Sequence, residues 1–171
     1  NILAVIVATI SCSTIGTAGE PNLGSDQQAT RILAESEVQG GLVVHLGCGD
    51  GHLTAAFRVN ERYLVQGLDA DATNVRSARA TVRQQGLCGK VTIDVCSGRY
   101  LPYIDNLVNL VVVEDFGNVS RQEVFRVLCP TCVALVRTDR GWEKTIQPRR
   151  DSLDAWTHHL HAPTNKPVPH A

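Results

Sequence analysis

Val43-Val44-His45-Leu46-Gly47-Cys48-Gly49-Asp50-Gly51-His52 is an apolar run that leads directly into three glycines at alternate positions. The apolar part predicts a buried strand, and the glycines allow a tight turn and a close approach of the backbone to a ligand. A helix predicted to begin near Leu53 would direct its free N–H groups and the positive end of its dipole toward that ligand. The segment therefore indicates a nucleotide or nucleoside pocket at the carboxyl edge of a parallel sheet.

Apolar runs and amphipathic segments alternate along most of the chain. Ser25 and Ser120 have capping-box partners three residues later, which predicts helix starts there. The alternation predicts an α/β fold with a doubly wound, Rossmann-like parallel sheet of about five strands in the order 3-2-1-4-5. The first strand then lies at the switch point, and its glycine turn faces the binding crevice. Strands are expected at about 42–46, 63–68, 91–95, 107–113 and 132–136, and helices at about 25–38, 53–59, 71–85 and 120–128.

The composition limits the classes of partner. The chain has 171 residues, of which 43% are hydrophobic, and its 16 basic residues are balanced by 17 acidic ones. This length fits one globular domain with additional terminal segments. Because the charge is balanced and only 5% of residues are aromatic, neither a basic face nor stacking platforms for nucleic acid are indicated. We therefore expect no nucleic-acid partner.

The second predicted strand ends on Asp69, about 20 residues after Gly49. In a βαβ unit this distance brings an acidic side chain to the ribose hydroxyls of a bound nucleoside. A carboxylate suits the task because it can accept from two adjacent hydroxyls at once. A dinucleotide fingerprint needs its third glycine one position after Gly51, where this chain has His52. The spacing therefore argues against NAD.

The G-x-G-x-G spacing of Gly47 to Gly51 instead resembles the first motif of class I S-adenosylmethionine-dependent methyltransferases. Gly67-Leu68-Asp69 is similar to that family's ribose-binding strand end. Leu128-Cys129-Pro130-Thr131-Cys132 is similar to its L-x-P-G-G turn before strand five. The resemblance covers about residues 26–138, and the chain is expected to lack the family's sixth and seventh strands.

The resemblance implies S-adenosylmethionine as cofactor. The three glycines would lie beneath its methionine and ribose parts, Asp69 would bind the ribose hydroxyls, and Ser97 would lie near the adenine amino group. His45 stands where many members have an acidic residue beside the methionine moiety. The cofactor-binding residues implied in this way are His45, Gly47, Cys48, Gly49, Gly51, Asp69, Ala70 and Ser97.

Glu114 and Asp115 follow the fourth predicted strand and would border the methyl-transfer site as candidate catalytic residues. Glu114, Asp115 or His45 could serve as a general base. An Asn-Pro-Pro-Tyr-like segment is absent after this strand, so methylation of nucleic-acid bases is unsupported. The methyl acceptor cannot be read from the sequence. The alternative to an enzyme is a non-catalytic nucleoside-binding or scaffold module of the larger exported β-propeller protein that the C-terminal resemblance described below implies.

Cysteine and histidine clusters allow several interpretations. Cys129 and Cys132 have the two-residue spacing of a redox pair or half of a zinc site. A redox pair normally opens a helix, whereas this one closes a helix, and no second pair exists, so the interpretations are a structural turn, a disulfide or a metal site. His158, His159 and His161 could bind a metal, or could be interface or linker residues. Cys48 is expected to fill space inside the glycine turn. We expect no metal site.

The two ends of the chain are assigned outside a domain at residues 20–140. Residues 1–19 contain an apolar run, Ile2 to Ile10, too short to span a membrane and similar to the remnant of a signal peptide. A buried strand or helix is the other interpretation. The protein would be exported or periplasmic if this segment is a signal, and cytoplasmic otherwise.

Residues 141–171 are expected to be a linker. Asp154-Ala155-Trp156-Thr157-His158-His159-Leu160-His161 resembles a segment of large bacterial proteins in which a methyltransferase-like domain precedes a pyrroloquinoline-quinone-type β-propeller. The resemblance implies such a propeller downstream as a partner domain.

Overall fold

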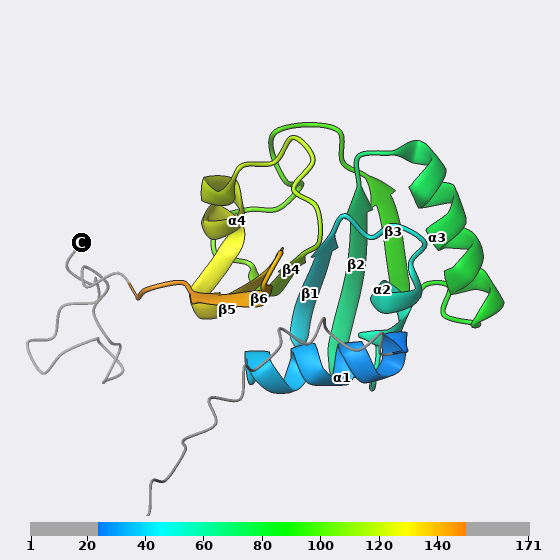
Figure 1. Ribbon diagram of the computed structural model, residues 1–171, viewed down its shortest axis with the longest axis horizontal. Coiled ribbons are helices and arrows are strands. Elements are labelled where there is room, and N and C mark those ends of the chain that lie inside the picture. Colours follow the sequence, from blue (N-terminus) through cyan, green and yellow to red (C-terminus); the bar gives the residue numbers. More distant parts are fainter. Residues whose placement is uncertain (1–23, 150–171) are drawn as a thin grey trace, which may run out of the picture.

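A six-stranded sheet in the order β3-β2-β1-β4-β5-β6 forms the centre of the computed structural model, which describes residues 24–149 (Figure 1). Neighbouring strands from β3 to β5 pair in parallel, and β6 is antiparallel to β5. The predicted parallel α/β fold and the order 3-2-1-4-5 are confirmed, and β1 lies where the order reverses. The strands are β1 (Gly41–Leu46), β2 (Tyr63–Asp69), β3 (Val91–Val95), β4 (Val108–Val113), β5 (Leu128–Thr138) and β6 (Gly141–Ile146).

Helices cover both faces of the sheet. α1 (Ser25–Ser36), α2 (His52–Ala56) and α3 (Ala72–Gln84) bury apolar side chains against one face, and α4 (Arg121–Val127) does so against the other. The side chains of β1 alternate between these two cores, since Val43 belongs to the first and Val44 to the second. Burial on both faces explains the unbroken apolar pattern of this strand. None of the helices formed by residues 24–149 is long and apolar enough to cross a membrane.

Two helix boundaries differ from their predictions. α1 begins at Ser25 itself, with Gly24 as the N-cap and no side-chain cap, so the predicted capping box there is wrong. α2 ends at Ala56 rather than near residue 59. It is short because Asn60 Oδ1 accepts a hydrogen bond from Arg62 N, which turns the chain into β2.

The sheet has one strand more than predicted. Residues 141–146, which were expected to begin a linker, form β6 and pair with β5 from Val133 to Thr138. The predicted boundary at residue 140 therefore cuts through a hairpin. Lys144 fixes this strand to α1, because its Nζ donates to Glu35 O at 2.7 Å and supplies a positive charge at the carboxyl end of that helix. The predicted signal-peptide remnant lies outside the described residues. The same holds for the predictions on His158, His159 and His161 and on the segment that resembles the start of a β-propeller protein.

Residues 96–107 connect β3 to β4 without a helix. The buried Glu123 of α4 holds this connection, since its carboxylate accepts from Leu101 N at 2.8 Å and pairs with Arg126. Arg126 Nη2 also donates to Tyr103 O. The predicted helix start at Ser120 is confirmed, as Ser120 Oγ accepts from Glu123 N. The Glu123 carboxylate, however, turns to the loop and does not complete a capping box.

Candidate functional site

The three glycines after β1 have positive φ angles but different neighbours. A Cβ at Gly47 would lie 2.5 Å from Asp115 N, and one at Gly51 would lie 2.7 Å from the Cα of Ala78 in α3. At Gly49 the same position has no atom within 4 Å. Gly47 and Gly51 therefore permit close packing of the turn on β4 and α3, whereas Gly49 leaves open space above the backbone. Of the three glycines predicted to lie under a ligand, Gly49 has free space above it, whereas Gly47 lines the cleft described below.

The Asp69 carboxylate lies at the end of β2, beside this turn, and is 6% exposed. Its Oδ2 accepts from Gly49 N at 3.0 Å and its Oδ1 from Asp71 N at 2.8 Å. The Asn74 side-chain amide donates to both oxygens at 3.2 Å. These donors are neutral, so they orient the carboxylate without cancelling its charge. The interaction between Gly49 and Asp69 joins two residues that the sequence predicted to act together.

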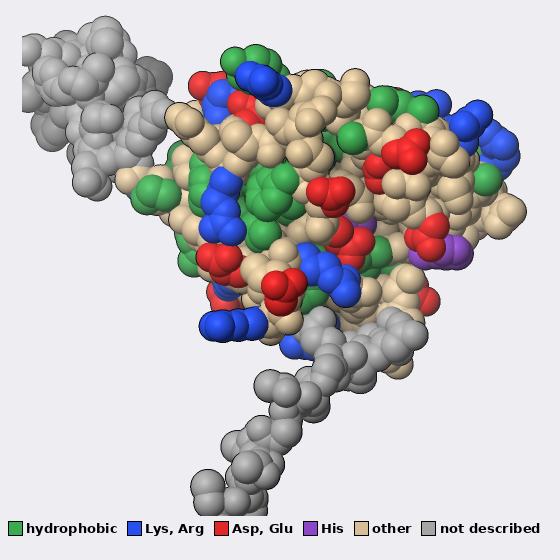
Figure 2. Space-filling view, turned by 45° about the horizontal axis from the view of Figure 1, so that its top comes forward, with side chains coloured by type: hydrophobic (Ala, Val, Ile, Leu, Met, Phe, Trp, Pro, Cys, Tyr) green, Lys and Arg blue, Asp and Glu red, His purple; other side chains and the backbone are tan. Residues whose placement is uncertain are grey.

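A shallow cleft of about 20 Å³ opens between the ends of β1, β2 and β4, at the edge that Figure 2 turns toward the viewer. Four of the predicted site residues line it: Gly47, Asp69, Ala70 and Asp115. The other lining residues are Leu46, Cys96, Phe116 and Gly117. This volume is far smaller than the roughly 300 Å³ at which small-molecule pockets begin. A nucleoside-sized ligand would therefore extend onto the open edge above it.

His45 lies under the turn and does not line the cleft. Its side chain is fully buried, with Nδ1 2.8 Å from Thr54 Oγ1 and the ring edge-on to Phe57. Within residues 24–149, Nε2 has no hydrogen-bond partner, and it lies 3.7 Å from Glu114 Oε2. The imidazole is thus a core group that faces Glu114 from below. This placement does not favour the direct contact with a cofactor that the family resemblance implied for His45.

Glu114, the residue after β4, is held by charged partners. Its Oε1 accepts from Arg137 Nη1 at 2.8 Å, and the Arg137 guanidinium lies 5.8 Å from the centre of the Trp142 ring. Burial raises the pKa of Glu114, but the nearby His45 imidazole and the hydrogen bond and charge of Arg137 outweigh this effect and leave the pKa lowered. A carboxylate with a lowered pKa is a weak proton acceptor, so the geometry does not favour Glu114 as a general base.

Asp115 and Ser97 lie on the two loops that border the cleft. Asp115 is exposed, and its Oδ1 accepts from Gly117 N at 3.0 Å. The Ser97 carbonyl accepts from Asn118 Nδ2 at 2.9 Å, which ties the loop after β3 to the loop after β4. Ser97 itself is exposed and does not line the cleft. Cys96 is the residue of this loop that lines it.

The thiols of Cys48 and Cys96, near the cleft, have raised pKa values and low reactivity. Burial, followed by the charge of Asp69, raises the pKa of Cys48 to about 12. Burial also raises the pKa of Cys96. Both side chains therefore stay protonated at neutral pH and are not nucleophiles. Cys48 packs against Gly67, where an added Cβ would lie 3.1 Å from its own, so it fills space as predicted.

The edge of the sheet around the cleft is acidic. Asp69 ends β2, and Asp50 and Asp115 follow β1 and β4 closely; Glu114, directly after β4, is paired with Arg137. The predicted anion-binding helix start is not available, because α2 has five residues and its first N–H, that of His52, donates to Asp50 Oδ1. Phosphate would meet repulsion here, whereas a neutral or cationic ligand would not. The charge pattern supports the sequence argument against NAD.

Two residues of the cleft wall were not predicted from the sequence. Phe116 and Gly117 line it because the chain bends over the end of β1 after Asp115. Their signal was the Asp115-Phe116-Gly117-Asn118 segment, which the sequence marked only as lacking a known motif. Among residues 24–149, no group of three or more His, Cys, Asp or Glu side chains could hold a metal ion. Of the alternatives for Cys129 and Cys132, the structure has the disulfide.

Comparisons with known proteins agree with this geometry. The chain is 30% identical over 131 residues to the ubiquinone/menaquinone biosynthesis C-methyltransferase UbiE of Yersinia enterocolitica, an alignment that covers 71% of this chain and 51% of that protein. The same enzyme of Yersinia pestis matches equally. The chain thus spans about half the length of the curated relatives it matches.

Two solved structures share the fold. A methyltransferase of Aquifex aeolicus that depends on S-adenosylmethionine superposes with a TM-score of 0.55 at 22% identity, over 63% of this chain and 62% of that one. Geranyl diphosphate C-methyltransferase of Streptomyces coelicolor A3(2), solved with S-adenosyl-L-homocysteine, gives 0.56 at 19% identity, over 64% and 44%.

The model of one protein family, described as a methyltransferase domain, matches residues 43–136. This range is more than half of the chain. It begins inside β1, includes the glycine turn, Asp69 and Glu114, and ends inside β5. The chain therefore belongs to the methyltransferase domain family.

Proposed function

We propose that this chain binds S-adenosylmethionine in the cleft beside Asp69 and transfers its methyl group to an acceptor. The observation that carries the proposal is the pairing of Gly49 with Asp69: open space above a glycine lies next to an oriented carboxylate whose charge is not cancelled. Vicinal hydroxyls need such a carboxylate, and a sulfonium cation is favoured by the acidic edge around it.

The residues present fit this cofactor. The Asp69 oxygens would accept from the ribose hydroxyls. The hydrogen bonds from Asn74 to Asp69 are the longest of its set, at 3.2 Å, so the Asn74 amide would either be displaced by the hydroxyls or bind them as well. Ala70 and Phe116 would flank the nucleoside as apolar walls of the cleft. Ser97 remains a proposed neighbour of the adenine, through the loop that its carbonyl fixes to Asn118.

When bound, the cofactor would supply an activated methyl group on a sulfonium, which an acceptor can displace as a neutral thioether. The chain's own contribution would be to position the reactants and to stabilise charge. Asp115 is the better placed of the two candidate catalytic residues, because it is exposed at the cleft and its hydrogen bond comes from the neutral Gly117 N. It would accept the proton that the acceptor loses.

The class of methyl acceptor is proposed from relatives and from the surface beside the cleft. A curated relative and a solved neighbour are both named as C-methyltransferases. Phe116 in the cleft wall and Val95, 49% exposed at the end of β3, offer apolar surface near the site. We therefore propose an apolar acceptor with a reactive carbon as the first class to test.

A nucleoside-binding module without catalysis is the second candidate. The Arg137–Glu114 ion pair favours it, because it withdraws one of the two carboxylates at the methyl-transfer edge from chemistry. In this case the domain would serve a larger protein. We propose the downstream β-propeller and the signal peptide on the sequence resemblance alone, since the segments concerned lie outside residues 24–149.

Calorimetric titration with S-adenosylhomocysteine and S-adenosylmethionine tests the cofactor proposal without knowledge of the acceptor. We expect saturable binding of one ligand per chain. The absence of binding at millimolar ligand would exclude both the enzyme and the nucleoside-binding module. Binding without methyl transfer to any apolar carbon acceptor, measured with a labelled methyl group, would favour the module.

A further inference from the structure

The Cys129–Cys132 disulfide closes a tight turn at the beginning of β5. The two Cα atoms are 5.2 Å apart, Pro130 occupies the second turn position, and Thr131, the third, has a φ of +67°. These are the features of a type II turn, whose third position favours glycine. The turn forms a bulge, because a single residue of β4, Asn109, lies opposite all four residues 129–132.

This disulfide contributes little as a structural staple. It closes a loop of four residues, which removes little entropy from the unfolded chain compared with a long loop. Thr131, a β-branched residue inside the closed loop, is in the left-handed region, where the Cβ is unfavourably close to the carbonyl oxygen. A domain of this size with two apolar cores does not depend on such a link. The oxidised turn is therefore strained, and opening the disulfide relieves that strain.

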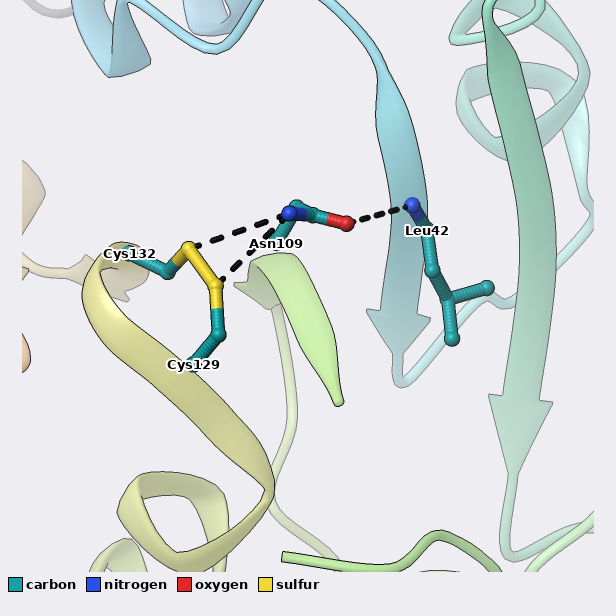
Figure 3. Close-up of a disulfide and its surroundings, with 4 residues drawn as sticks. All are labelled: Leu42, Asn109, Cys129 and Cys132. Atoms are coloured by element: carbon teal, nitrogen blue, oxygen red, sulfur yellow. Dashed lines mark hydrogen bonds between the residues drawn. A yellow bond between two sulfur atoms is a disulfide. The ribbon is translucent and has the colours of Figure 1, made fainter. Parts of the chain in front are cut away.

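Asn109 is placed to assist the opening (Figure 3). Its Nδ2 donates toward both sulfurs, at 3.6 Å to Cys129 Sγ and 3.9 Å to Cys132 Sγ. The orientation of its amide is fixed, because Oδ1 accepts from Leu42 N at 2.9 Å. Gly41 makes the room for this contact, since a Cβ there would lie 2.2 Å from Asn109 Oδ1. The amide therefore presents a donor to whichever sulfur carries the negative charge of a leaving thiolate.

We propose that Cys129 and Cys132 form a thiol–disulfide exchange site for small thiols of the glutathione class. A thiolate of the small thiol attacks one sulfur, the S–S bond breaks, and the other cysteine leaves as a thiolate beside Asn109. A second small thiolate attacks the outer sulfur of the mixed disulfide and releases the first cysteine. Two thiols are thereby oxidised to one small disulfide, the protein disulfide is reduced to two thiols, and protons return from water.

The site is separate from the cleft and has its own consequence. It lies at the amino end of β5, whereas the cleft is at the carboxyl edge of the sheet. Thr131 N donates to Gln147 O and Gln147 N donates to Cys132 O, both at 2.8 Å, so the turn holds the chain just after β6. Both cysteines are half-buried rather than enclosed, and Thr131 is exposed. Exchange at this turn loosens the point where the sheet passes into the C-terminal segment.

The test equilibrates the full chain, carrying Cys88→Ser to remove an exposed free thiol, in glutathione buffers from a cytosolic to an endoplasmic-reticulum poise. Differential alkylation and mass spectrometry of the peptide with Cys129 and Cys132 report its oxidation, and circular dichroism reports folding. We expect half-reduction within this range while the fold is retained. A disulfide that stays oxidised throughout, or that opens only as the protein unfolds, would overturn the proposal.

Thr131→Gly tests whether backbone strain at residue 131 makes the disulfide easy to reduce. Because glycine relieves the oxidised turn, we expect its equilibrium with glutathione to shift toward the disulfide by about five- to thirty-fold. Thr131→Asn, which tolerates a left-handed backbone better than threonine, should fall between. An unchanged equilibrium in both variants would refute a strain-driven site. Cys132→Ser should trap glutathione on Cys129 as a mixed disulfide, and failure to do so would also count against exchange. None of these readouts depends on methyl transfer or cofactor binding.

Discussion

The ends of β2 and β4 each place a carboxylate at the same edge of the sheet, but the two carboxylates have opposite surroundings. Asp69 is held by backbone N–H groups and an amide, all neutral. Glu114 is held by the Arg137 guanidinium and faces the His45 imidazole. The end of β2 therefore keeps an oriented charge that a ligand can use, whereas the end of β4 has largely neutralised its own. Position at the sheet edge does not decide function here; the charge of the partners does.

In the glycine turn, Gly47 packs against Asp115 after β4, whereas Gly49 donates to Asp69 at the end of β2. Replacing these glycines by alanine should have the largest effect on stability. Gly47→Ala places a Cβ against the backbone of Asp115, at a residue with a φ of +77°. Overlap and backbone strain together should lower the free energy of unfolding by about 2–5 kcal/mol. Gly49→Ala, with the same conformational problem but open space, should lose about 1–2 kcal/mol. Urea denaturation measures both, and equal losses would contradict the distinction drawn between the two glycines.

Cofactor affinity should separate the two carboxylates next. Asp69→Asn removes the charge that orients ribose hydroxyls but keeps a side-chain oxygen, and should weaken binding of S-adenosylhomocysteine by about 1.5–3 kcal/mol. Glu114→Gln, the matched change at the end of β4, should alter it by less than about 0.5 kcal/mol, because its charge is already paired. Calorimetric titration of the two variants with S-adenosylhomocysteine measures both changes in affinity. Similar losses would show that the ribose has been assigned to the wrong strand end.

The dependence of stability on pH should come from the part of the chain after β3. The pKa of Glu123 is lowered by its hydrogen bond from Arg126, and that of Glu114 is lowered as well. Because these folded-state pKa values lie below the unfolded ones, the stabilisation is complete above the ordinary glutamate pKa and is lost as the pH falls through the folded value. Unfolding followed between neutral pH and about pH 3 should show this loss.

Glu123→Gln identifies the larger source. It should cost about 1–2 kcal/mol at neutral pH, since Arg126 keeps Asp105 and the loop carbonyl, and it should flatten the acid limb of the stability curve. Glu35→Gln, at an exposed helix pair, is the control and should leave the curve unchanged. An acid limb as steep as in the wild type would place the titrating groups elsewhere.

These differences also explain which features were predictable from sequence. β1, the glycine turn and Asp69 follow from local patterns, because the strand is apolar on both faces and the spacing of Gly49 and Asp69 is fixed by one βαβ unit. β6 was missed because it is a half-exposed edge strand whose existence depends on pairing with β5. The Arg137–Glu114 ion pair was missed for the same reason, since no local pattern joins residues on different strands. His45 was assigned to a ligand because a strand position does not reveal that its ring lies against Thr54 and Phe57.

The smallest expected effect is also the most direct test of the comparison. Arg137→Gln removes the cation from Glu114 and should make the end of β4 resemble that of β2. The pair is partly exposed, with side chains 49% and 27% accessible, so stability should change by less than about 1 kcal/mol. The released negative charge should favour the sulfonium cation over the uncharged thioether, so that S-adenosylmethionine gains about two- to five-fold in affinity relative to S-adenosylhomocysteine. Added salt should diminish this gain, because exposed charges are screened.

Arg121→Gln is the matched control, since Arg121 pairs with Glu143 at a similar exposure and neither residue lines the cleft. It should leave the ratio of the two affinities unchanged at every salt concentration. Paired titrations of the two ligands with both variants measure the difference. If Arg137→Gln also leaves the ratio unchanged, the charge of Glu114 does not reach the cofactor, and the contrast between the two strand ends concerns stability rather than binding.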